Sequence, residues 1–315
     1  MLTGAMHVLS FIGSAAFYLP LLVIVYWCVD PRLGARAAVV LSFGSVVNTW
    51  LKLVFHAPRP FWTDTSVTGH EPRESFGMPS GHAQNAVALW GYLAAQTRRR
   101  VLWAAALALI AGIGVSRVVL GVHSVGQVLA GWAVGAAVLA AALWLEPRVV
   151  PWWTARSLPE QFGFSLAVAL AALGGMWAAV EALEGWRWPT AWARAIAQAG
   201  GSVEPITLSE GAAAAGGLFG LLAGLSYAAS RIGYDAGGEP WRRLARIPVG
   251  AAGAMAIYTL GLFLGTQPFQ AFVVQALLAL WATAGAPEVF VRLRLARGTP
   301  RALTRAGEER ARIRQ

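Results

Sequence analysis

The sequence is poor in cysteine, lysine and acidic residues. Its single cysteine, Cys28, excludes an internal disulfide and a thiolate metal cluster. Charged side chains make up 13% of the chain, which is too few for the surface of an ordinary soluble protein of 315 residues. Lys52 is the only lysine among 25 basic residues, and composition does not explain why a lysine stands at this one position.

The chain is instead rich in apolar residues, which form 57% of it and give a mean hydropathy of +0.55. A hydrocarbon core about 30 Å thick needs roughly 20 mostly apolar residues per helix. Nine windows satisfy this requirement, which predicts an all-α polytopic integral membrane protein of about nine helices. The windows cover residues 4–28, 36–56, 80–97, 101–120, 123–145, 162–182, 209–229, 247–266 and 269–291.

The arginines are distributed unevenly between the ends of these windows. An odd number of spans places the termini on opposite sides, and cytoplasmic loops carry the excess of Lys and Arg. Most arginines, including the run 98–100 and those after residue 292, then share one side. This predicts a cytoplasmic C-terminus and an N-terminus outside, in a bacterium on the periplasmic face of the inner membrane. We expect a core over 1–145, further helices over 146–291 and a basic cytoplasmic tail over 292–315.

Two cations stand at the end of the second window, in the run from Lys52 to Pro60. Pro58 and Pro60 stop the helix and stiffen the turn, which holds Arg59 back toward the helix end. Both cations could instead extend to lipid headgroups. Arginine serves that purpose elsewhere in this chain, so the lysine favours a specific role.

A second cluster begins the third window. Ser80 is a good N-cap, Gly81 lets a ligand approach the backbone, and the free N–H groups of a helix start bind anions. His82 then lies in the first turn. Taken alone, this pattern also fits a plain capped helix with an interfacial histidine.

A third cluster joins the fourth and fifth windows. Gly121 is a natural helix stop. His123 and Gln127 are four residues apart at the start of the next helix, so they share one face and Gln127 can reach the His123 ring. Arg117 precedes this turn.

Together the three clusters supply three cations, a helix N-terminus and two histidines, without paired carboxylates or metal-ligand spacing. Such a set suits a tetrahedral oxyanion and phosphoryl transfer, in which one histidine attacks and the other protonates the leaving oxygen. No cofactor, metal or nucleic acid is expected.

The pattern Lys52-x6-Arg59-Pro60, Pro79-Ser80-Gly81-His82 and Ser116-Arg117-x5-His123 resembles the signature of the type 2 phosphatidic acid phosphatase superfamily, over roughly residues 1–145. The resemblance implies a phosphatase core on the second to fifth helices that works without metal. It implies that His123 is the nucleophile, which forms a phosphohistidine, and that His82 is the general acid. The implied phosphate ligands are Lys52, Arg59, Ser80, Gly81 and Arg117.

Gln127 departs from the pattern, because the superfamily commonly has aspartate four residues after the nucleophile. Its carbonyl oxygen can orient the His123 ring but cannot compensate its charge. Glutamine here, the pair Phe61-Trp62 and nine spans resemble the glucose-6-phosphatase branch.

The sequence therefore predicts a membrane phosphatase acting on a phosphomonoester, or a diphosphate, of a lipid or isoprenoid at the outer face. A glucose-6-phosphatase-like hydrolase of a soluble sugar phosphate is the alternative enzyme. A non-catalytic scaffold and a lipid transporter remain alternatives of other classes.

Overall fold

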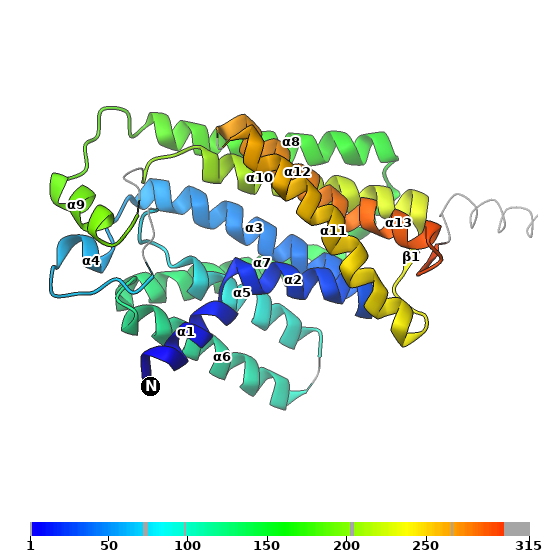
Figure 1. The fold of residues 1–315 in the computed structure, drawn as a ribbon, viewed down its shortest axis with the longest axis horizontal. Helices are drawn as coiled ribbons and strands as arrows, with labels where there is room; N and C mark the ends of the chain where they lie inside the picture. The colour runs from blue at the N-terminus through cyan, green and yellow to red at the C-terminus, as the bar shows by residue number, and fades with distance from the viewer. Residues whose placement is uncertain (1, 72–74, 98, 202–204, 266, 299–315) are drawn as a thin grey trace, which may run out of the picture. The chain divides into compact units, whose positions relative to one another are not determined.

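The structure is a computed structural model that describes residues 2–71, 75–97, 99–201, 205–265 and 267–298. It divides into two compact units, each built from three separate stretches of chain. Unit 1 comprises Met1–Leu19, Val40–Val149 and Ala172–Gly211; unit 2 comprises Pro20–Val39, Val150–Ala171 and Ala212–Gln315. Nearly all regular structure is helical (Figure 1), so the predicted all-α class is confirmed.

Five helices contribute residues to both units, because the division falls within them. These are α2 (Ala15–Ile24), α3 (Pro31–Phe55), α7 (Val125–Ala155), α8 (Leu158–Glu181) and α10 (Ser209–Tyr227). Asp30 directly precedes α3 and caps it. Its carboxylate accepts hydrogen bonds from the backbone N–H groups of Arg32 and Leu33 at 2.8 and 3.1 Å.

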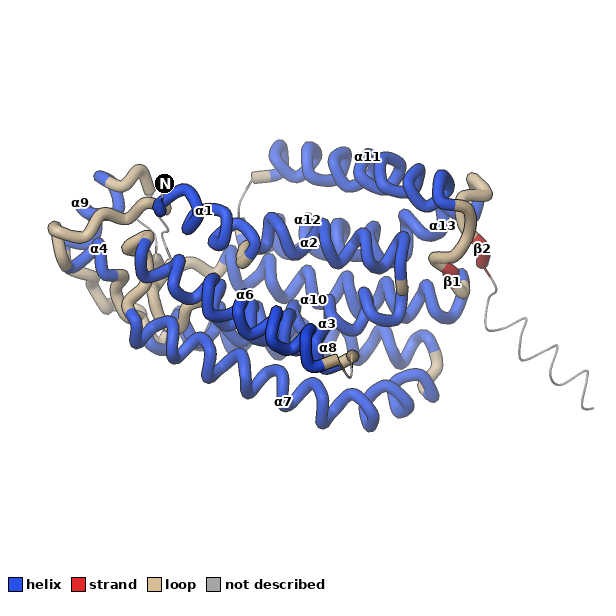
Figure 2. The backbone as a smooth tube through the Cα atoms, turned by 90° about the horizontal axis from the view of Figure 1, so that it is seen from below, coloured by secondary structure: helices blue, strands red, loops and turns tan. Residues whose placement is uncertain are grey.

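Unit 1 is completed by α1 (Leu2–Ile12), α4 (Pro60–Thr63), α5 (Gly81–Ala95), α6 (Arg100–Val119) and α9 (Thr190–Gln198). α5 and α6 form an antiparallel hairpin (Figure 1), and α1 packs against α6 (Figure 2). α4 and α9 also pack together. Trp62 of α4 lies 5.8 Å from Trp192 of α9, measured between ring centroids.

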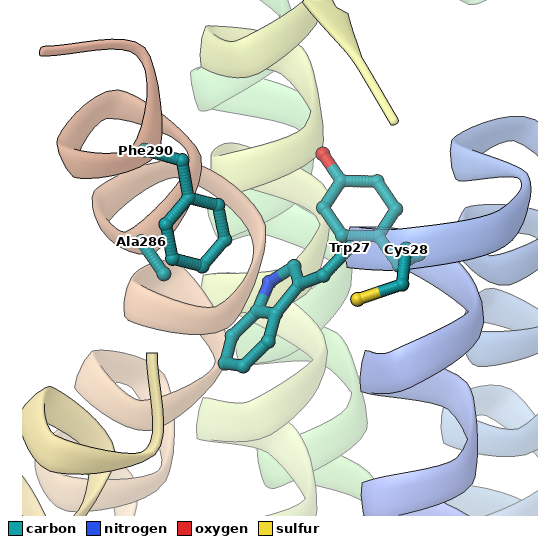
Figure 3. Packing of buried hydrophobic residues seen from close by; sticks show 5 residues of the cluster. Trp27, Cys28, Ala286 and Phe290 are labelled. Carbon is teal, nitrogen blue, oxygen red and sulfur yellow. The ribbon is translucent and has the colours of Figure 1, made fainter. Parts of the chain in front are cut away.

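Unit 2 adds three π-helical turns, three helices and a two-residue antiparallel strand pair. They are η1 (Val25–Val29), η2 (Ala228–Ile232), β1 (Tyr234–Asp235), α11 (Pro240–Leu264), α12 (Pro268–Leu280), η3 (Trp281–Gly285), α13 (Ala286–Arg292) and β2 (Arg297–Gly298). Its core lies where η1 meets α13. There the indole of Trp27 meets the ring of Phe290 edge-on at 5.3 Å (Figure 3).

One arginine holds this end of unit 2 together. Arg246 of α11 is fully buried, and its guanidinium donates to the backbone carbonyls of Trp27, Ala236, Gly237 and Leu295. Buried charges need such hydrogen bonds to offset lost hydration. Arg246 therefore joins three segments that are distant in the sequence.

Seven helices of the described residues are long and apolar enough to cross a membrane, and an eighth span is possible if a bent pair counts as one. That pair, Thr3–Ile12 and Ala15–Val29, bends by 46° within the first predicted window. The break falls at Gly13 and Ser14, where the Ser14 hydroxyl donates to the Phe11 carbonyl at 2.7 Å.

The predicted count of nine spans is not confirmed. The third window, 80–97, forms the 15-residue helix α5, which is only about 22 Å long and shorter than the hydrocarbon core. The helix ends at Ala95, where the backbone N–H and the hydroxyl of Thr97 both donate to the Ala94 carbonyl, at 3.0 and 2.9 Å. The predicted domains 1–145, 146–291 and 292–315 stay a prediction, and residues 299–315 of the tail lie outside the described residues.

Candidate active site

The three sequence clusters meet at one end of unit 1. Because α5 and α6 run antiparallel, the start of α5 at Gly81 and the end of α6 at Val119 lie at the same end of the hairpin. Gly121 stops α6 as predicted, with a positive φ of 70°. The Ser80 N–H donates to the Gln127 carbonyl at 3.0 Å, which joins the second cluster to the third.

The start of α5 packs closely against α7. A side chain at Gly131 would come within 2.6 Å of the Ser80 carbonyl, so only glycine allows this approach. The Asn48 amide of α3 donates to the Pro79 carbonyl at 3.3 Å. Ser80 holds the predicted N-cap position, but its side chain makes no cap bond. Its buried hydroxyl has no hydrogen-bond partner among the described residues.

The first cluster contacts the loop before α5. Lys52 donates to the Ser75 hydroxyl at 2.8 Å. Arg59 is 2% exposed and donates to the Ser75 carbonyl at 2.8 Å and to the Val122 carbonyl at 3.0 Å. The proline-flanked turn therefore fixes Arg59 between the loop and the third cluster.

His123 is held from both sides. The Gln127 amide nitrogen donates to the Pro58 carbonyl at 2.7 Å, so its oxygen must face His123, where it lies 3.1 Å from Nδ1. This oxygen only accepts, which places the ring proton on Nδ1. Nε2 therefore keeps its lone pair, which accepts a hydrogen bond from Arg59 Nη1 at 3.2 Å. The predicted reach of Gln127 to the ring is present.

The surroundings of His123 favour its neutral form. Burial lowers the pKa of His123 well below its usual value, and the positive charges of Arg59, Arg117 and Lys52 lower this pKa further. A neutral imidazole whose Nε2 carries no proton can act as a nucleophile.

These groups line a cavity of about 490 Å³. Of the predicted site residues, it is lined by Lys52, Arg59, Gly81, His82, Arg117 and His123. Ser80 and Gln127 do not line it; Gln127 lies behind the His123 ring. No group of three or more His, Cys, Asp or Glu in the described ranges could hold a metal ion.

Several residues of the cavity are not predicted from the sequence. Ser75 and Glu71 come from the loop before α5, His7 and Ser10 from α1, and Glu210 from the first turn of α10. Neither a motif nor helical spacing links these positions to the three clusters. The only sequence signal is the scarcity of histidine and acidic residues in the chain.

Two segments match known protein families. Residues 33–151 match the PAP2 superfamily, and residues 212–298 match the PAP2 superfamily phosphatase, transmembrane extension.

Three curated proteins are similar to parts of the chain. Lipid phosphate phosphatase delta of Arabidopsis thaliana is 29% identical over 183 residues, which cover 50% of this chain and 44% of that protein. Phosphatidylglycerophosphatase B of Bacillus subtilis is 29% identical over 42% of this chain and 68% of its own length. Sphingosine-1-phosphate phosphatase 2 of Mus musculus is 27% identical over 41% and 38%. The chain therefore spans less than half of the first and third relatives.

A solved structure is also similar. It is the crystal structure of a transmembrane PAP2 type phosphatidylglycerolphosphate phosphatase from Bacillus subtilis, with 24% identity and a TM-score of 0.41. The match covers 47% of this chain and 78% of that one.

Proposed function

Since this chain carries a PAP2 superfamily domain followed by the transmembrane extension of that superfamily, we propose that it is an integral membrane phosphatase for lipid phosphates. The family matches confirm the resemblance predicted from the three motifs. The predicted integral membrane character also agrees with the apolar helices of both units.

One observation carries the proposal. The His123 ring is fixed by Gln127 on Nδ1, and its Nε2 lone pair faces Arg59, which lines the same cavity as Lys52 and Arg117. A nucleophile beside three cations suits attack on a phosphoryl group, because the cations neutralise its equatorial oxygens.

The first step forms a phosphohistidine. His123 Nε2 attacks phosphorus while the bond from phosphorus to the ester oxygen breaks. His82, which lines the same cavity, gives a proton to the departing oxygen and releases an alcohol. The backbone at Gly81, which lines the cavity, assists at the start of α5, where the helix dipole favours an anion.

The second step hydrolyses the phosphohistidine and restores the free enzyme. His82 takes a proton from a water molecule, the water oxygen attacks phosphorus, and the bond from phosphorus to His123 breaks to release inorganic phosphate. Both steps, as written above, use only side chains, backbone groups and water, without a metal ion. Turnover is therefore expected to survive a metal chelator.

The substrate is a phosphomonoester, or a diphosphate, of a lipid or isoprenoid. The names of the three relatives support this class, and so does a site at helix ends in an apolar protein. The arginine distribution supports an outer, periplasmic site in a bacterial inner membrane. The predicted sugar phosphate alternative gains no specific support from the cavity.

Trapping of the intermediate tests the mechanism. Purified protein in detergent is mixed with a ³²P-labelled lipid phosphate and quenched in alkali, in which phosphohistidine survives. The wild type and His56→Asn should retain label, because His56 does not line the cavity, whereas His123→Ala should not. Label on folded His123→Ala would exclude this residue as the nucleophile. Faster phosphate release from glucose 6-phosphate than from lipid phosphates would reject the lipid substrate.

A further inference from the structure

A carboxylate contacts one of the proposed phosphate ligands. Glu71 Oε2 lies 2.6 Å from Nη1 of Arg117, whose side chain is fully buried. Lys52 and Arg59 donate to oxygens of Ser75 and Val122. Arg117 thus forms an ion pair with a carboxylate that lines the same cavity.

Two residues of α1 hold the Glu71 carboxylate in place. The Ser10 hydroxyl donates to Oε2 at 2.8 Å and also contacts Arg117 Nη1. His7 Nδ1 lies 3.1 Å from Oε1, and its side chain is 44% exposed. Burial alone would raise the pKa of Glu71, but the hydrogen bond and charge of Arg117, with Ser10 and His7, lower this pKa below its usual value.

A carboxylate oxygen and a phosphate oxygen use the same guanidinium donors in the same geometry. They also repel each other when both are charged, and the cavity wall offers limited room around a buried arginine. Both cannot therefore occupy Nη1 of Arg117 together.

We infer that the Glu71 carboxylate takes the position on Arg117 that a substrate phosphate oxygen needs, so that Glu71 and substrate exclude each other. The inference rests on the proposed role of Arg117 as a phosphate ligand. When substrate binds, the carboxylate leaves Arg117 and keeps its contact with His7, on the exposed side of the cavity.

This exchange weakens the binding of every phosphate in a membrane by a similar factor, so that only the tightly bound ones fill the cavity. A phosphomonoester carries up to two negative charges, whereas the phosphodiester of a bulk phospholipid carries one. The dianion gains more from the three cations and displaces Glu71 more readily. Glu71 therefore keeps abundant diester headgroups out of a cationic cavity that they would otherwise fill.

Binding measurements without turnover test this inference. Titration calorimetry of the full chain in detergent measures the Kd of inorganic phosphate, and competition measures the Ki of dioleoyl phosphatidylglycerol, a diester. Glu71→Gln should bind both anions about tenfold more tightly, because a charged competitor is removed. Glu71→Ala should change both constants in the same direction.

Glu210→Gln is the matched control. Glu210 lines the same cavity but forms no ion pair with Arg117 in the described residues, so its change should be much smaller. Unchanged or weaker phosphate binding in both Glu71 variants would show that Glu71 only positions Arg117. An equal effect of Glu210→Gln would show a general effect of charge; either result overturns the inference. Absence of a phosphoenzyme, in contrast, would reject the proposed function and leave this binding test intact.

Discussion

Replacement of Gln127 by leucine tests whether the amide is what makes His123 reactive. Leucine has nearly the volume of glutamine but removes two contacts, the one at 3.1 Å to His123 Nδ1 and the one at 2.7 Å to the Pro58 carbonyl. The His123 ring then loses its only fixed acceptor on that side in the described structure. Both its orientation and its tautomer become free.

The size of the effect follows from the charge that develops on His123. In the proposed mechanism the ring becomes cationic as it bonds to phosphorus, so the lost hydrogen bond is a charge-assisted one, of about 1.5–3 kcal/mol. This corresponds to a roughly 10- to 150-fold fall in kcat. KM should change little, because Gln127 does not line the cavity.

The assay is steady-state and single-turnover hydrolysis of a lipid phosphate by purified protein in detergent. Gln96→Leu is the control, since it removes an exposed amide at the far end of α5. A folded Gln127→Leu protein with kcat within about twofold of wild type would refute the orienting role. Gln127→Glu should be slower than wild type at neutral pH, because a carboxylate oxygen would replace the donor to Pro58. A faster Gln127→Glu enzyme would mean that the missing charge, not the amide contact, limits the reaction.

Two further predictions concern the other groups of the cavity. His82→Ala should slow phosphoenzyme formation from alkyl phosphates but keep the pre-steady-state burst of p-nitrophenol from p-nitrophenyl phosphate, whose leaving group needs no proton; equal loss of both would exclude His82 as general acid. The acid limb of kcat/KM due to His123 should lie below pH 6.5, because burial and the cations Arg59, Arg117 and Lys52 lower its pKa. Lys52→Met removes one positive charge, so the limb should move to higher pH, and an unmoved limb would contradict this coupling.

The sequence predicts those features of the fold that arise from local pattern. Apolar windows indicate helices because a helix needs about 20 apolar residues to cross the bilayer. Gly121 indicates the end of α6 because glycine tolerates a positive φ. The spacing of four residues between His123 and Gln127 predicts their contact, because residues four apart lie on one face of a helix.

Features that depend on tertiary contacts are not visible in the sequence. His7 and Ser10 precede the first motif by some forty residues, and only the packing of α1 on α6 brings them to Arg117. The orientation of the Gln127 amide likewise depends on the Pro58 carbonyl, which a helical pattern does not reveal. The window 80–97 exceeds α5 by a few residues, because composition does not reveal that Thr97 bonds back to the Ala94 carbonyl.

The hydrogen bonds of Arg246 determine when unit 2 can complete its folding during synthesis. The Trp27 carbonyl, near the start of the chain, shares this guanidinium with the Leu295 carbonyl. At about 5–20 residues per second, a ribosome needs tens of seconds to travel between these positions. During that interval the first helices are already made, but their partners are not. Biogenesis therefore requires that the early segments wait in the membrane or the insertion machinery until the last helices arrive.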